Sequence, residues 1–148
     1  MLATVEATAL AEAIRLSAWA YPALEAIHIA SIGTLFGSVL LLELRVLGLG
    51  RAIGVVPLAR LVLRTALIAF ASAAISGSLL FVSAATEVAA NPAFRVKLVL
   101  ILIAGLNAIV FHARGGLREG DSLARLQAAA SLLLWLSVVV AGRLIAYL

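Results

Sequence analysis

The amino-acid sequence predicts an all-α integral membrane protein, a four-helix up-down bundle preceded by a short interfacial helix. Hydrophobic residues make up 65% of the 148 residues and charged residues only 12%. Soluble domains are about half apolar and a quarter charged, so one domain of this length could not enclose so much apolar surface. The sequence also contains four runs of the roughly 20 apolar residues that a helix needs to cross a bilayer. We therefore expect a single membrane domain over residues 1–148.

The four membrane-spanning helices are expected where the apolar runs lie, at about residues 22–44, 58–86, 94–112 and 123–147. Pro22, Pro57 and Pro92 fall just before or at the helix starts, where a missing N–H costs no hydrogen bond. Glycines break the first and third connections between the runs. These are Gly48, Gly50 and Gly54 in the first, and Gly115, Gly116 and Gly120 in the third.

The segment at about residues 4–20 differs from the four apolar runs. Glu6, Glu12 and Arg15 interrupt it, while its apolar residues recur on one helical face. This pattern predicts a short helix in the membrane interface, with Trp19 and Tyr21 at headgroup level. No basic segment precedes an apolar core, so a cleavable signal peptide is not expected.

The composition excludes several classes of site. The chain has no cysteine, and Met1 is its only methionine. Disulfides, iron–sulfur clusters, thiolate-held zinc and covalently attached haem are therefore excluded, and a Cu(I) site is disfavoured. Because the basic residues lie between apolar runs, the net charge of +4 does not indicate a nucleic-acid partner. His28 and His112 are the only histidines.

The distribution of Lys and Arg predicts the orientation. Seven arginines flank the two glycine-containing connections, and four basic residues lie at the other ends of the helices. Positive charge favours the cytoplasmic side, so both connections are expected in the cytoplasm and both termini outside it. The seven are Arg45, Arg51, Arg60, Arg64, Arg114, Arg118 and Arg125, and the four are Arg15, Arg95, Lys97 and Arg143.

Polar residues from all four predicted helices fall at one level of the membrane, near the outer ends. Ionisable groups within a membrane are costly, so they are functional candidates by default. His28 lies about 9 Å into the first helix, at 1.5 Å per residue, and Glu25 is one turn above it. The expected site consists of Glu25, His28, Glu87, Lys97 and Arg143.

Other residues have structural interpretations. Ala26, Ala30, Gly33 and Gly37 form a stripe that would let a neighbouring backbone approach closely. Glu43 and Arg45 are expected to pair at a helix end, and Lys97 and Arg143 could extend to lipid headgroups without further duty. His112 is expected at the opposite interface. Because the first and third helices should run parallel, His28 and His112 are not expected to share a cofactor.

Two stretches carry a resemblance to known families. One is Leu24-Glu25-Ala26-Ile27-His28, followed by Gly37 and Leu44-Arg45, and the other is Phe94-Arg95-Val96-Lys97-Leu98, followed by Asn107 and Phe111-His112. Together they resemble a small family of uncharacterised bacterial four-helix membrane proteins. More distantly they resemble the four-helix membrane protoporphyrinogen oxidases and the copper-resistance protein D group. In the oxidases, a histidine of the first helix and a lysine that opens the third are functional, and haem b is bound.

The oxidase resemblance implies a haem b-binding redox protein of the bacterial inner membrane. His28 and Lys97 match its two functional positions, whereas the aromatic-rich motif of the oxidases' first helix is absent. His28 would be the axial metal ligand with Glu25 fixing its tautomer, and Lys97 and Arg143 would neutralise the haem propionates. A quinone or porphyrin-like molecule would then exchange electrons.

The sequence leaves two alternative functions open. One is a non-enzymatic transport or accessory subunit whose polar ring binds a metal or an anion. The other is a purely structural subunit of a larger membrane complex or a homo-oligomer, associated through its small-residue faces.

Overall fold

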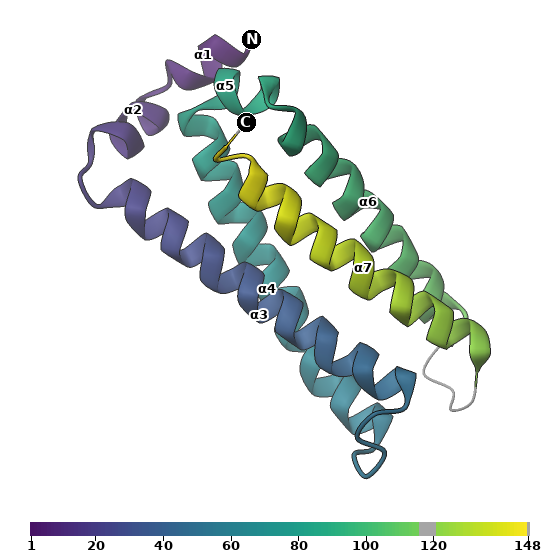
Figure 1. Ribbon diagram of the computed structural model, residues 1–148. Coiled ribbons are helices and arrows are strands. Elements are labelled where there is room, and N and C mark those ends of the chain that lie inside the picture. Colours follow the sequence, from purple (N-terminus) through teal and green to yellow (C-terminus); the bar gives the residue numbers. More distant parts are fainter. Residues whose placement is uncertain (116–120, 148) are drawn as a thin grey trace.

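The computed structural model describes residues 1–115 and 121–147, and these residues form helices without any strand. Four helices are long and apolar enough to cross a membrane: α3 (Ala20–Leu47), α4 (Val55–Ser83), α6 (Pro92–Ala113) and α7 (Ser122–Leu144). They run alternately up and down (Figure 1). The predicted fold class is confirmed, and the chain is a multi-pass membrane protein with a short N-terminal helical segment.

Three short helices cover one end of the bundle: α1 (Leu2–Glu6), α2 (Ala9–Leu16) and α5 (Ala85–Ala90). Both ends of the chain lie at this end, which we call the terminal end (Figure 1). The opposite end, where α3 leads to α4 and α6 leads to α7, is the loop end. The predicted interfacial helix is divided into α1 and α2 at Ala7 and Thr8. The Thr8 hydroxyl caps α2 by accepting a hydrogen bond from the backbone N–H of Ala11.

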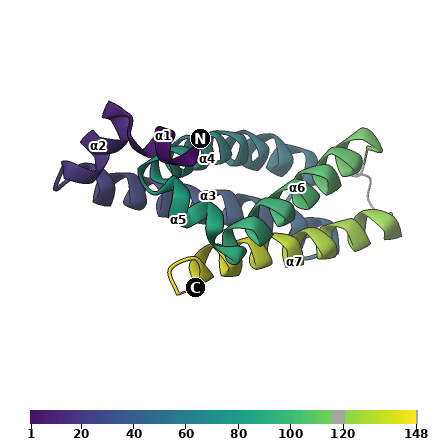
Figure 2. The same cartoon turned by 90° about the horizontal axis from the view of Figure 1, so that it is seen from above.

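The four long helices pack in the order α4, α3, α7, α6. α3 packs against α4 and α7, and α7 packs against α6, whereas α4 and α6 do not pack along one another within the described residues (Figure 2). Near the terminal end, however, the rings of Phe81 on α4 and Phe94 on α6 stack with their centroids 5.4 Å apart. α3 and α7 therefore form the middle of the bundle, and α4 and α6 flank them.

A heptad pattern of small residues brings α3 and α4 together. The buried residues of α4 recur at intervals of three and four as far as Ser76, as do the buried residues of α3 from Ser31 to Leu42. Small side chains at such positions allow close backbone approach without a driving force from water. The residues are Ala59, Val62, Ala66, Ala69, Ala73 and Ser76 on α4, and Ser31, Leu35, Ser38 and Leu42 on α3.

The prediction that the small residues of the first helix form a packing face is wrong within this chain. Ala26, Ala30 and Gly33 are exposed, and a Cβ added at Gly33 or Gly37 would meet nothing within 4 Å. α3 instead packs through its opposite side, because the polar groups of that side find hydrogen-bond partners on α4.

The second predicted helix ends earlier than expected. α4 stops at Ser83, and Ala84 turns the chain into α5, so Glu87 belongs to α5 and not to a membrane-spanning helix. The N-terminal segment supports this break. Arg15 donates to the Ser83 carbonyl (3.0 Å), and the Glu6 carboxylate accepts from the Thr86 N–H (2.7 Å) and hydroxyl (2.9 Å).

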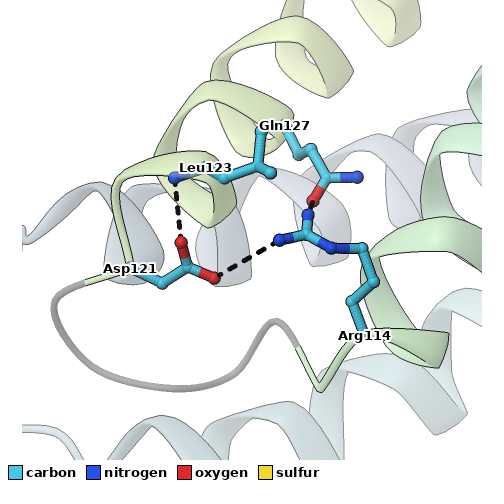
Figure 3. A network of polar contacts seen from close by, with 4 residues as sticks. All are labelled: Arg114, Asp121, Leu123 and Gln127. Carbon is cyan, nitrogen blue, oxygen red and sulfur yellow. Dashed lines mark hydrogen bonds and ion pairs between the residues drawn. The ribbon is translucent and has the colours of Figure 1, made fainter.

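Polar side chains fix the helix ends. Gly48 terminates α3 with φ +105°, and the N–H of Leu49 bonds back to the Leu44 carbonyl in a Schellman arrangement. The Asp121 carboxylate caps α7 by accepting from the Leu123 N–H (2.9 Å). Its other oxygen lies 4.0 Å from the Arg114 guanidinium, which also donates to the side-chain oxygen of Gln127 (2.9 Å). Arg114 thereby joins the end of α6 to the start of α7 (Figure 3). The predicted loop residues Gly116, Arg118 and Gly120 lie outside the described residues, as does Leu148.

Candidate functional site

His28 lies on α3 in the terminal half of the bundle and turns its ring toward α4. Its Nδ1 is 2.9 Å from the Ala73 carbonyl oxygen and 3.1 Å from the Ser76 hydroxyl. A carbonyl only accepts, so Nδ1 carries the proton and donates it. The neutral ring therefore keeps a lone pair on Nε2, which has no hydrogen-bond partner among the described residues.

The His28 ring fits against the backbone of α4 because residue 77 is a glycine. A Cβ at Gly77 would lie 3.3 Å from Nδ1 and only 2.8 Å from the ring carbon Cε1, and the second distance is shorter than real Cβ contacts. The ring position is thus fixed by a hydrogen bond on one side and by backbone on another. The sequence pattern did not identify Gly77, because a glycine within an apolar run does not reveal whether it faces a neighbouring helix or the lipid.

Lys97 occupies a comparable position on the other half of the bundle. It lies on α6, one turn after Phe94, and its chain passes Gly142 of α7, where an added Cβ would be 3.4 Å from Nζ. The Lys97 ammonium is within electrostatic range of His28, and no described residue bonds to it or pairs with it. His28 and Lys97 are both half-buried and together form what we call the His28–Lys97 site.

A chain of hydroxyl groups continues from His28 along the α3–α4 contact. The Ser76 hydroxyl donates to the Ser72 carbonyl (2.7 Å), and the Ser72 hydroxyl lies 2.7 Å from that of Ser31. Such hydrogen bonds satisfy polar groups in a region without water. This chain ends at an apolar layer of Leu35, Ala66 and Ala69, against which Val39 and Trp135 pack.

The other three predicted site residues are exposed at the terminal end. Glu25 makes no hydrogen bond to His28, so the Ala73 carbonyl takes the role that was expected of Glu25. Glu87 lies on α5 beside a depression of about 370 Å³ that Asn91 and Tyr147 also line. Arg143 donates to the Tyr147 hydroxyl (2.7 Å), and its guanidinium lies 4.9 Å from the centre of that ring.

Glu43 and Arg45 do not form the expected helix-end pair. Glu43 is buried on α3, with the Ser131 hydroxyl of α7 within hydrogen-bonding reach. Arg45, also buried, donates through Nε to the Ile53 carbonyl (2.6 Å).

His112 lies in the last turn of α6 at the loop end, exposed, with Nδ1 2.8 Å from the Ala108 carbonyl oxygen. It is therefore at the opposite end of the bundle from His28. Within residues 1–115 and 121–147, no three His, Cys, Asp or Glu side chains gather closely enough to hold a metal ion.

No family model, curated protein or solved structure matches this chain.

Proposed function

We propose that the protein is a haem b-binding redox protein of the bacterial inner membrane, with His28 as the axial ligand. The observation that carries the proposal is the orientation of the His28 ring. Its Nδ1–H donates to the Ala73 carbonyl, and its Nε2 lone pair has no partner within residues 1–115 and 121–147. Imidazoles that bind metals usually have their second nitrogen held in this way, which fixes the tautomer and raises ligand basicity.

The absence of other ligands around His28 in the described chain favours haem over a bare metal ion. A single imidazole binds an isolated ion weakly, whereas a haem already supplies four nitrogen ligands and needs only axial ones. Bound haem would supply one-electron chemistry. Lys97, unpaired and within electrostatic range of His28, would neutralise a propionate, and Arg143 at the terminal end would meet a second one.

The arginine distribution and the helix packing determine how the His28–Lys97 site is reached. The arginine excess at the loop end supports a cytoplasmic location for that end, and hence external termini. The His28–Lys97 site would then lie in the outer half of the membrane. A quinone or porphyrin-like molecule could reach it from the lipid phase, since among the described residues α4 and α6 do not pack together beyond the Phe81–Phe94 stack.

Absorption spectroscopy of the purified protein, titrated with haemin, tests the proposal. We expect a Soret band that His28→Asn removes, because asparagine can still donate to the Ala73 carbonyl but offers no ligand in place of Nε2. His112→Ala is the matched control and should keep the band. A wild-type protein with which added haemin keeps the spectrum of free haemin would overturn the proposal in favour of a transport or accessory subunit.

A further inference from the structure

Glu43 is a buried ionisable group that the His28–Lys97 site does not use. It lies on α3 four residues before the helix ends, with only 7% of its surface exposed. Its Oε2 is buried and has no hydrogen-bond partner in the part of the chain that the structure describes. The side chain facing it is Ser131 of α7, itself buried. The carboxyl group therefore has one neutral neighbour and one unsatisfied oxygen.

No charge of the described chain compensates Glu43. On α3 the nearest charged residue is Arg45, whose Nε bonds to the Ile53 carbonyl. On α4, Arg60 and Arg64 are exposed, and on α7, Arg125 is exposed and extends toward Gly48. The charged residues of α2 lie at the terminal end. An ionised carboxylate without a partner is costly to bury, whereas the neutral acid can hydrogen-bond to a hydroxyl.

The position of Glu43 separates it from the His28–Lys97 site. Glu43 lies fifteen positions after His28, so the two residues are about 22 Å apart along α3. The apolar layer of Leu35, Ala66 and Ala69 lies between them, with Trp135 from α7 packed against it. The two polar regions thus face opposite sides of the membrane and are not joined by hydrogen-bonded side chains in the described structure.

We infer that Glu43 and Ser131 form a proton-binding site on the loop-end side of the apolar layer. The Glu43 carboxyl binds the proton and the Ser131 hydroxyl hydrogen-bonds to the acid. The occupant is a proton and not a metal ion, because the three side-chain oxygens of Glu43 and Ser131 are too few to replace the hydration of a cation. The inference does not depend on haem binding, since it involves neither His28 nor Lys97.

Infrared spectroscopy of the purified protein in lipid vesicles tests the inference. A protonated carboxyl group gives a carbonyl band separate from the ionised carboxylate bands. We expect such a band at neutral pH in the wild type, its loss in Glu43→Gln, and its shift in Ser131→Ala as a hydrogen bond is removed. Glu25→Gln is the matched control on the same helix and should leave the band unchanged. A wild-type protein without an acid carbonyl band at neutral pH, or a band that persists in Glu43→Gln, would overturn the inference.

Chemical labelling gives a second, independent readout. Dicyclohexylcarbodiimide is apolar and reacts with a protonated carboxyl group. The carboxyl O–H adds across a C=N bond to give an O-acylisourea, whose acyl group then migrates from oxygen to nitrogen to give a stable N-acylurea without loss of atoms. We expect the Glu43 peptide to gain the mass of one carbodiimide, and the labelled fraction to fall as the pH is raised. Protection of Glu43 by sodium ions at constant pH would overturn the proton assignment, because the site would then hold a cation.

Discussion

The imidazole ring of His28 lies directly on the backbone of α4 at Gly77, so closely that a methyl group there would be 2.8 Å from Cε1. The hydrogen bond from His28 to the Ala73 carbonyl, one turn earlier, holds the ring in this position. The two contacts connect the proposed ligand rigidly to the neighbouring helix. The orientation of Nε2 is therefore a property of the α3–α4 pair.

Gly77→Ala should destabilise the protein by about 1–3 kcal/mol, the usual cost of overpacking, because neither the ring nor the backbone can move freely. Gly33→Ala is the matched control on the exposed side of α3, where an added Cβ meets nothing within 4 Å. There alanine should be neutral or stabilising by up to about 1 kcal/mol through helix propensity. Thermal unfolding in detergent distinguishes the two variants, and equal midpoints would contradict the Gly77 contact.

The N-terminal segment should detach from the bundle in acid. Hydrogen bonds from the backbone N–H and the hydroxyl of Thr86, with a smaller effect of the Arg15 charge, hold the pKa of Glu6 below its ordinary value. A carboxyl group with a lowered pKa in the folded state stabilises the contact above its ordinary pKa. That stabilisation is lost as the pH falls through the lowered value.

Amide hydrogen exchange of residues 2–16, followed from neutral pH into acid, measures this detachment. After correction for intrinsic exchange, protection should fall in acid in the wild type. In Glu6→Gln it should be reduced at neutral pH and vary little. Unchanged protection across the acid range in the wild type would show that Glu6 does not hold the segment.

Much of the fold could be predicted from the sequence, because the length of an apolar run determines whether it can span a bilayer. The break at Ala84 could not, since no glycine or proline marks it. Its supporting contacts come from Glu6 and Arg15, about 70 to 80 residues earlier in the chain. The depth of each residue in the membrane, counted along its helix, identified Glu25 and His28 as neighbours. Depth alone could not show that the His28 side chain faces α4 whereas Glu25 is exposed.

The start of α6 depends on Asn91 in two ways. Its side-chain oxygen accepts from the Ala93 N–H (2.9 Å), and its amide nitrogen donates to the Ile145 carbonyl beyond α7 (3.1 Å). Asn91→Ala removes both bonds and should cost about 1–2 kcal/mol. Asn91→Asp keeps the cap and loses only the donor, so its unfolding midpoint should lie between those of the wild type and Asn91→Ala. If both variants unfold at the wild-type temperature, these contacts do not stabilise the protein.

The orientation of the bundle can be tested with topology reporters. Fusions at Gly50 and Gly116, in the two loop-end connections, should report a cytoplasmic location, because the arginine excess lies there. A fusion at Leu148 should report the external side. Cytoplasmic signal at Leu148 would reverse the orientation and place the His28–Lys97 site in the inner leaflet, while leaving the number of spans unchanged.

Replacing His112 should leave any haem spectrum unchanged, although two histidines in a helical bundle suggest a pair of axial ligands. α3 and α6 both begin at the terminal end, and His28 lies eight residues into α3 whereas His112 lies twenty residues into α6. At 1.5 Å per residue these depths are about 12 and 30 Å, an offset of about 18 Å along the bundle. Axial ligands must lie on either side of one iron at nearly the same level, so a single haem cannot bridge this offset. If haem binds, its sixth ligand is therefore absent, a water, Lys97, or His28 of a second copy across a homodimer axis. Absorption spectra of oxidised and reduced His112→Ala should match the wild type in position and intensity, while His28→Asn loses the Soret band. A change from six- to five-coordinate haem in His112→Ala would contradict both the ligand assignment and the parallel arrangement of α3 and α6.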